Sequence, residues 1–121
     1  MTNYAQELDG AFHALSDPTR RGIVSRLTRG PASVTELHKP VTMAMPTLLQ
    51  HVRVLERSGL IGTAKVGRVR MCELKPQALG VTESWLARQR SVWEARLERM
   101  ETYVLELNRK EKKSGKRKRQ A

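Results

Sequence analysis

Residues 47–61, TLLQHVRVLERSGLI, combine side chains that can form hydrogen bonds with side chains that can only pack. Leu48, Val52 and Leu55 recur at helical spacing, whereas Gln50 and Arg53 fall on the opposite side at about 100° per residue. Glutamine can form two hydrogen bonds to an adenine edge, and arginine is as able to contact phosphate as a base. The alternative is an ordinary solvated helix face, for which similar residues would serve.

The charge of the chain favours a polyanionic partner. Its 121 residues include 23 Lys and Arg against 12 Asp and Glu, for a net charge of +11. Nucleic acid and an anionic membrane surface are the two candidate partners. The chain has no apolar run of the roughly 18 residues that a membrane span needs, and its N-terminus lacks the basic and apolar regions of a secretory signal. We therefore expect an intracellular protein that does not enter a membrane.

The C-terminal segment RKEKKSGKRKRQA differs from the rest of the chain in charge. Between Arg109 and Arg119 it holds eight basic residues and one acidic residue, a net charge of +7. Ala121 is its one apolar residue, so the segment cannot offset its ordering entropy by burial. The sequence predicts a domain over residues 1–108 and a disordered basic tail over residues 109–121. That tail either adds nonspecific electrostatic affinity or is inert.

Apolar spacing and helix-start signals predict three helices in the first part of the chain. Leu8 and Phe12 belong to an apolar stripe that ends before Asp17, which can cap a second helix whose first position suits Pro18. The segment SVTE, residues 33–36, matches a capping box, in which the serine accepts from a backbone N–H and the glutamate reaches back. A short third helix therefore begins there.

The following segments predict a helix, a hairpin and a long last helix. The stretch quoted first forms the helix, with Pro46 in its first turn and Gly59 as its C-terminal stop. Residues 60–74, LIGTAKVGRVRMCEL, partly alternate apolar and polar side chains around Gly67, which is typical of a β-hairpin. The last helix runs over residues 82–108, and its apolar stripe is too long for so small a domain to cover alone. Either a second copy covers the stripe through two-fold symmetry, or the helix folds back on its own domain.

A helix, a short turn, a second helix and a basic hairpin, in that order, make a winged helix-turn-helix, whose second helix enters the DNA major groove. The segments ALSDPTRRGIVSRL, SVTELHKPVTMAMPTLLQHVRVLERSGLI and GRVRMCELKPQAL also resemble the ArsR family of bacterial transcriptional regulators, especially its metal-independent members with a long terminal helix. The resemblance covers residues 8–107. We therefore expect a mainly α fold with a small β-hairpin.

The resemblance implies a homodimer that represses transcription at a palindromic operator in a bacterial cytoplasm, in association with the nucleoid. It leaves open whether a small-molecule inducer exists. The first and last helices would form the dimer interface. The residues expected there are Leu8, Phe12, Trp93, Leu97, Met100, Val104 and Leu107.

Double-stranded DNA is the partner expected for the fourth helix and the hairpin. On the helix, threonine can bond either base type and an exposed leucine can contact a thymine methyl group. The cations of the hairpin suit phosphate or minor-groove contacts, although they could also be solubilising charge alone. The predicted DNA-binding residues are Met45, Pro46, Thr47, Leu49, Gln50, His51, Arg53, Arg57, Lys65, Arg68 and Arg70.

Two positions depart from the family pattern, which often has serine in place of Ala44 and Leu49. Ala44 cannot cap a helix with its side chain, and the lost hydrogen bond costs about 1 kcal/mol unless Thr42 substitutes. His51 matches a histidine that lies beside the DNA backbone in the family. A structural histidine with satisfied hydrogen bonds is an equal alternative.

No metal or other cofactor is expected. Metal-sensing members of the family place paired cysteines in the helix that here reads VTELHKP, or Asp and His ligands along the last helix. This chain has His38 alone in the first place and no histidine after His51, so neither ligand set is present. Cys72 is expected to alternate inward with Leu74 as a small buried side chain.

Two other functions compete with a sequence-specific regulator. One is a nonspecific architectural DNA-binding protein that depends on the basic tail. The other is a protein-interaction module that keeps the fold. Its distinguishing feature would be a neutral or acidic recognition helix and hairpin, which this sequence does not show. We do not expect an enzyme, because the three histidines fall in different elements and no glycine-rich phosphate loop or nucleophile motif is present.

Overall fold

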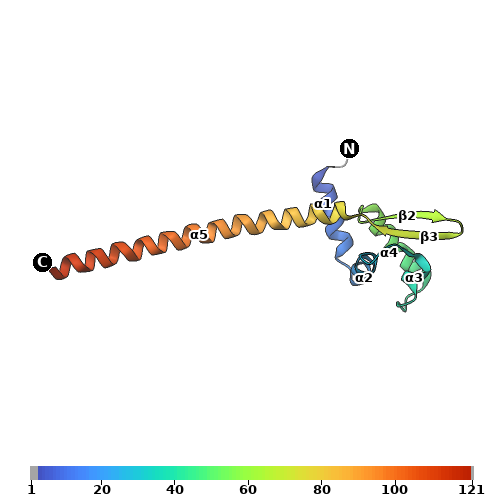
Figure 1. Cartoon of the computed structure of the whole chain (residues 1–121), viewed down its shortest axis with the longest axis horizontal. Coiled ribbons are helices and arrows are strands. Elements are labelled where there is room, and N and C mark those ends of the chain that lie inside the picture. Colours follow the sequence, from blue (N-terminus) through green and yellow to red (C-terminus); the bar gives the residue numbers. More distant parts are fainter. Residues whose placement is uncertain (1–2, 121) are drawn as a thin grey trace. The chain divides into compact units, whose positions relative to one another are not determined.

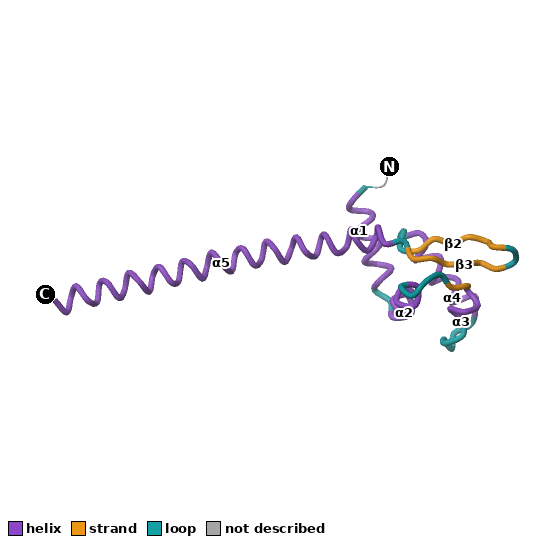
Figure 2. Tube along the Cα trace, in the orientation of Figure 1, coloured by secondary structure: helices purple, strands orange, loops and turns teal. Residues whose placement is uncertain are grey.

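The computed structural model describes residues 3–120, with side chains as far as residue 115, and divides into two units, Met1–Ser84 and Trp85–Ala121. The prediction of a mainly helical fold with a small hairpin is confirmed (Figure 1 and Figure 2). In chain order the elements are α1 (Tyr4–Leu15), α2 (Pro18–Leu27), β1 (Ala32–Ser33), α3 (Val34–His38), α4 (Met45–Arg57), β2 (Ile61–Val66), β3 (Val69–Leu74) and α5 (Pro76–Gln120).

The starts of α2 and α3 follow from their capping residues. The Asp17 carboxylate accepts from the backbone N–H of Arg20 at 3.0 Å, and Pro18 occupies the first turn of α2, as predicted. The Ser33 hydroxyl accepts from the Glu36 N–H at 3.1 Å. The return bond of the capping box differs from the prediction. The Glu36 carboxylate accepts from the Ser33 hydroxyl at 3.2 Å instead of from a backbone N–H. Ser33 also belongs to β1, where it lies opposite Met71 of β3.

Both ends of α4 match their sequence signals. Ala44 makes no side-chain capping bond, and Thr42 does not substitute for it. At the other end Gly59 has a φ of 81°, a conformation that favours glycine. The Gly59 N–H donates to the Glu56 carbonyl at 3.1 Å and the Leu60 N–H to the Leu55 carbonyl at 3.2 Å. This pair of bonds is a Schellman motif, which ends the helix sharply and leads the chain into β2.

The hairpin forms as predicted, with β2 and β3 antiparallel and joined by Gly67 and Arg68 (Figure 2). A further strand, β1, is not predicted from the sequence and adds to the free edge of β3 to give the order β1-β3-β2. With two residues, β1 is too short to show an alternating pattern.

The core of the first unit lies between the helices and the sheet. Leu48, Val52 and Leu55 of α4 are fully buried, as their spacing predicts. Cys72 is also fully buried and Leu74 partly so, which confirms their predicted inward alternation. Burial raises the pKa of the Cys72 thiol. The thiol is therefore protonated at neutral pH and packs as an apolar side chain.

The last helix is longer than the predicted span of residues 82–108. It begins at Pro76, because proline is tolerated in the first turn of a helix, and it continues through Gln120. The sequence predicts a disordered tail over residues 109–121, whereas α5 includes residues 109–120. Lys, Arg and Glu are good helix formers, and no proline interrupts them. Ala121 lies outside the described residues, and the division at residue 108 stays a prediction.

Candidate nucleic-acid interface

Helix α4 has one face in the core and the opposite face in solvent. Because Leu48, Val52 and Leu55 are fully buried, the rotation of the helix about its own axis is set. Met45 and Leu49 flank the buried stripe and pack partly against the core, so Leu49 is less exposed than expected. The predicted DNA-binding residues that are exposed on this helix are Pro46, Thr47, Gln50, Arg53 and Arg57.

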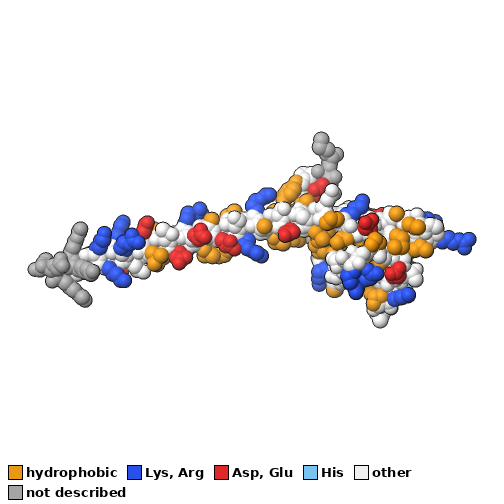
Figure 3. Space-filling model, viewed as in Figure 1, with side chains coloured by type: hydrophobic (Ala, Val, Ile, Leu, Met, Phe, Trp, Pro, Cys, Tyr) orange, Lys and Arg blue, Asp and Glu red, His pale blue; other side chains and the backbone are white. Residues whose placement is uncertain are grey.

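The hairpin carries cations at its tip (Figure 3). Lys65 and Arg68 are exposed there, as predicted. Arg70 is only partly exposed, since its guanidinium lies 3.5 Å from the Glu56 carboxylate of α4 and 3.4 Å from the Thr63 hydroxyl. The Thr63 hydroxyl donates to the same carboxylate. Arg70 therefore connects the hairpin to α4, in addition to any contact with DNA.

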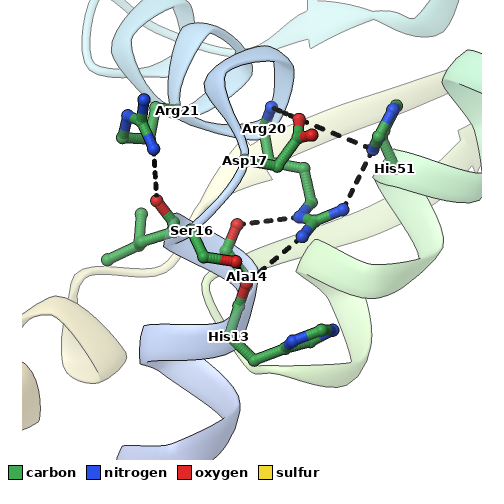
Figure 4. Close-up of polar contacts among 8 residues, drawn as sticks. His13, Ala14, Ser16, Asp17, Arg20, Arg21 and His51 are labelled. Carbon is green, nitrogen blue, oxygen red and sulfur yellow. Dashed lines mark hydrogen bonds and ion pairs between the residues drawn. The ribbon is translucent and has the colours of Figure 1, made fainter.

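Arg20 connects α1, α2 and α4 (Figure 4). Its side chain is nearly buried, and its Nε donates to the Ala14 carbonyl at 2.8 Å. One terminal nitrogen donates to the His13 carbonyl at 3.2 Å, and the other lies 3.1 Å from Nδ1 of His51. Because a guanidinium can only donate, Nδ1 of His51 is the acceptor of this hydrogen bond. This bond supports the structural reading of His51, and its DNA contact stays a prediction.

Asp17 completes this cluster. The backbone N–H of Arg20 has the largest effect and holds the pKa of the Asp17 carboxyl below its ordinary value. Burial has the second-largest effect and raises this pKa, while the nearby His51 and Arg20 lower it further. The Asp17 carboxylate lies 3.8 Å from Nδ1 of His51. The cap of α2 is thus ionised at neutral pH and faces the histidine of α4.

Arg20 and Glu56 position the site but are not among the residues predicted from the sequence. A signal exists for Arg20, because it shares helical spacing with Ile23, Val24 and Leu27 and so falls on the buried face of α2. Glu56 is the one acidic residue of α4, but nothing in the local sequence indicates that it meets a hairpin arginine. That contact depends on how the hairpin folds back beside the helix.

The histidines and the cysteine do not converge. His38 donates from Nε2 to the Met43 carbonyl at 2.9 Å, and His51 contacts Arg20. Within the described part of the chain, no three His, Cys, Asp or Glu side chains are grouped so that they could hold a metal ion. No helix among these residues is long and apolar enough to span a membrane.

The residues predicted for a dimer interface are divided between the two units. Leu8 is buried in the single chain, which leaves little of its surface for a partner, and Phe12 is 38% exposed. The interface residues predicted on α5 are between 44% and 58% exposed. They are Trp93, Leu97, Met100, Val104 and Leu107.

The order of α3, α4 and the hairpin, with a polar exposed face on α4 and cations at the hairpin tip, defines a winged helix-turn-helix protein of the DNA-binding class. Residues 15–62 match a helix-turn-helix domain family. The chain is 38% identical over 80 residues to HTH-type transcriptional regulator Rv2034 of Mycobacterium tuberculosis, covering 66% of this chain and 75% of that protein. This chain belongs to the ArsR family of transcriptional regulators.

Further relatives agree with this assignment. The crystal structure of an ArsR family transcriptional regulator, RHA00566, is 49% identical with a TM-score of 0.73, covering 78% of this chain and 97% of that one. An ArsR-like transcriptional regulator from Rhodococcus sp. RHA1 is 31% identical with a TM-score of 0.68, covering 78% and 89%. The biofilm growth-associated repressor of Xylella fastidiosa is 35% identical over 65 residues, covering 54% of this chain and 57% of that protein.

Proposed function

We propose that the protein is a homodimeric repressor that binds a palindromic DNA operator and senses no metal. The observation that carries the proposal is the orientation of α4. Its apolar stripe is fully buried, so the side chains of Thr47, Gln50 and Arg53 face solvent on a helix of the size that enters the major groove. Gln50 is the residue we assign to base reading, and Arg53 and Arg57 can neutralise phosphates.

The hairpin supplies a second contact to the same duplex. Lys65 and Arg68 are exposed at its tip and are suited to phosphates or to the minor groove. The contacts of Arg70 with Glu56 and Thr63 restrict the movement of the hairpin relative to α4. We therefore infer that helix and hairpin meet the DNA as one rigid element.

The apolar stripe of α5 supports the dimer. Trp93, Leu97, Met100, Val104 and Leu107 follow one another at alternating steps of four and three residues. This is the spacing of a seam along which two helices pack against each other. A dimer lets two copies of α4 address half-sites about one helical turn apart, near 34 Å.

Binding to a fragment of the DNA upstream of its own gene, with unrelated DNA as competitor, tests this function. Specific sites bind roughly 10³ to 10⁷ times more tightly than nonspecific DNA. Equal affinity for both DNAs would favour the alternative of a nonspecific architectural DNA-binding protein. No binding to either DNA would favour the alternative of a protein-interaction module.

Two variants refine the test. Gln50→Ala removes a base-edge contact of about 1–3 kcal/mol, so it should weaken operator binding and relax the base preference. Arg68→Ala should instead lower affinity for all sequences alike and flatten the dependence on salt, because it removes a phosphate contact. An unchanged base preference in Gln50→Ala would remove this residue from the reading face.

A further inference from the structure

A groove of about 680 Å³ opens between α2 and the segment formed by α3 and the turn after it. Its lining includes none of the residues predicted to contact DNA. Ile23 and Leu37, both core residues, form part of its wall together with Pro40 and Val41. The volume lies in the range of about 300–1,000 Å³ that small-molecule sites occupy, and the wall is mainly apolar as such sites are.

Gly22 lies in this wall, near the middle of the ten residues of α2. Glycine is among the poorest helix formers, so helix propensity does not account for its place inside α2, whereas an unusual backbone angle or a close neighbour would. Gly22 has neither, because its φ is not positive and a Cβ there would meet nothing within 4 Å. Gly22 therefore leaves this part of the groove wall without a side chain.

The groove also has a cation without a counter-ion. Arg26 donates to the Gly30 carbonyl at 3.3 Å and pairs with the Glu36 carboxylate at 3.4 Å, so its charge is compensated. The side chain of Arg29, which lines the same groove, makes no hydrogen bond or ion pair with any described residue. An apolar wall beside a free guanidinium is complementary to an apolar molecule that carries one negative charge.

We propose that this groove binds a small organic anion, with its apolar part against Ile23, Leu37 and Val41 and its charged group at Arg29. The ligand would touch α3, the first helix of the helix-turn-helix, and the turn that leads into α4. The site is therefore distinct from the DNA-facing surface but shares elements with the motif that positions it.

Anilinonaphthalene sulfonate, a fluorescent aromatic anion, is a suitable probe for titration of the full chain. Gly22→Leu fills the groove and should abolish one saturable class of binding. Gly80→Leu is the matched control, because Gly80 is an exposed helical glycine outside the groove and a Cβ there also meets nothing within 4 Å. Probe bound elsewhere, such as on the apolar stripe of α5, is the same in all variants. Identical titrations for the unaltered chain and Gly22→Leu would overturn the proposal.

The charge of the ligand is tested separately with Arg29→Gln. This variant should bind the sulfonate probe about tenfold more weakly, because a charge-assisted hydrogen bond is lost. It should bind phenylnaphthylamine, the uncharged analogue, as the unaltered chain does. Equal effects on both probes, or none on either, would contradict an anion at Arg29. Far-ultraviolet circular dichroism checks that each variant keeps its helices.

Discussion

Residues 3–84 bury a core of their own, whereas residues 86–115 are exposed without exception. In the first unit α1 to α4 and the hairpin share one apolar cluster. In the second unit a single helix presents its apolar side chains to solvent, and isolated helices in water owe little stability to propensity alone. The first unit can therefore be stable by itself, whereas the exposed apolar stripe of the second is consistent with the dimer proposed above.

The two units also differ in the side chains that are available to join one element to another. In the first unit, Arg20 and Arg70 join elements that are far apart in the sequence. In the second unit, the apolar seam ends at Leu107 and only charged or small side chains follow as far as residue 115, apart from Asn108. We infer that support from a partner helix ends near that point.

The largest expected effect breaks the second unit and leaves the first intact. Leu97→Glu combined with Met100→Glu should abolish the dimer and operator binding, because large apolar side chains dominate such interfaces and unpaired charges there are costly. Sedimentation and operator binding measure the outcome, and hydrogen exchange should show protection retained within residues 3–84.

The matched control for this change is Val92→Glu combined with Leu105→Glu. Both residues are as exposed as the seam residues, at 62% and 57%, but they lie off the stripe. This control should remain a dimer. If instead the Leu97 and Met100 variant stays dimeric and binds operator normally, the interface lies elsewhere, with Phe12 in α1 as the next residue to change.

A core substitution contrasts the units in stability. Leu55→Ala in α4 should lower the free energy of unfolding by about 2–5 kcal/mol, because it leaves a cavity in a fully buried site. Leu105→Ala in α5 should change it by no more than about 0.5 kcal/mol, as exposed positions do. Denaturant unfolding at one protein concentration measures both. Similar losses for the two variants would mean that Leu105 is buried in the assembled protein.

A gain of stability is expected at the start of α4. Ala44 has the extended backbone of a capping residue, with φ −66° and ψ 151°, but no side-chain oxygen. Ala44→Ser should raise the free energy of unfolding by about 1 kcal/mol, because the hydroxyl can accept from a free N–H of the first turn. Ala44→Val adds bulk without an oxygen and should give no gain. Thermal unfolding of the two variants measures the difference in stability. Equal stability of the two variants would show that water already satisfies the free N–H groups of this turn.

The smallest effect concerns pH and the first unit. Because folding lowers the pKa of Asp17 from about 3.8, the ionised cap stabilises the folded chain above that pH, and the contribution is lost as the pH falls through the folded-state value. Asp17→Asn keeps a capping side chain but not the charge. Its deficit in stability should therefore be present at neutral pH and shrink in acid. A deficit that does not change with pH would contradict this role.

Much of the fold could be predicted from the sequence because its signals are local. Asp17 with Pro18, and Gly59 with its following turn, specify helix ends through residues a few positions apart. The burial of Leu48 and Val52 follows from spacing alone. The predicted start of α5 is wrong, since Pro76 is as compatible with a first helical turn as with the end of a strand.

The sequence by itself determined which face of α4 is polar and where the basic hairpin begins, because both are set by neighbouring residues and by helical or strand periodicity. Only the tertiary structure decided that Arg20 reaches His51, which is 31 residues away, and that Arg70 is held by Glu56. It alone decided that Gly22 and Arg29 share one groove. Such contacts depend on the packing of whole elements against each other, and packing leaves no local pattern from which a particular partner can be recognised.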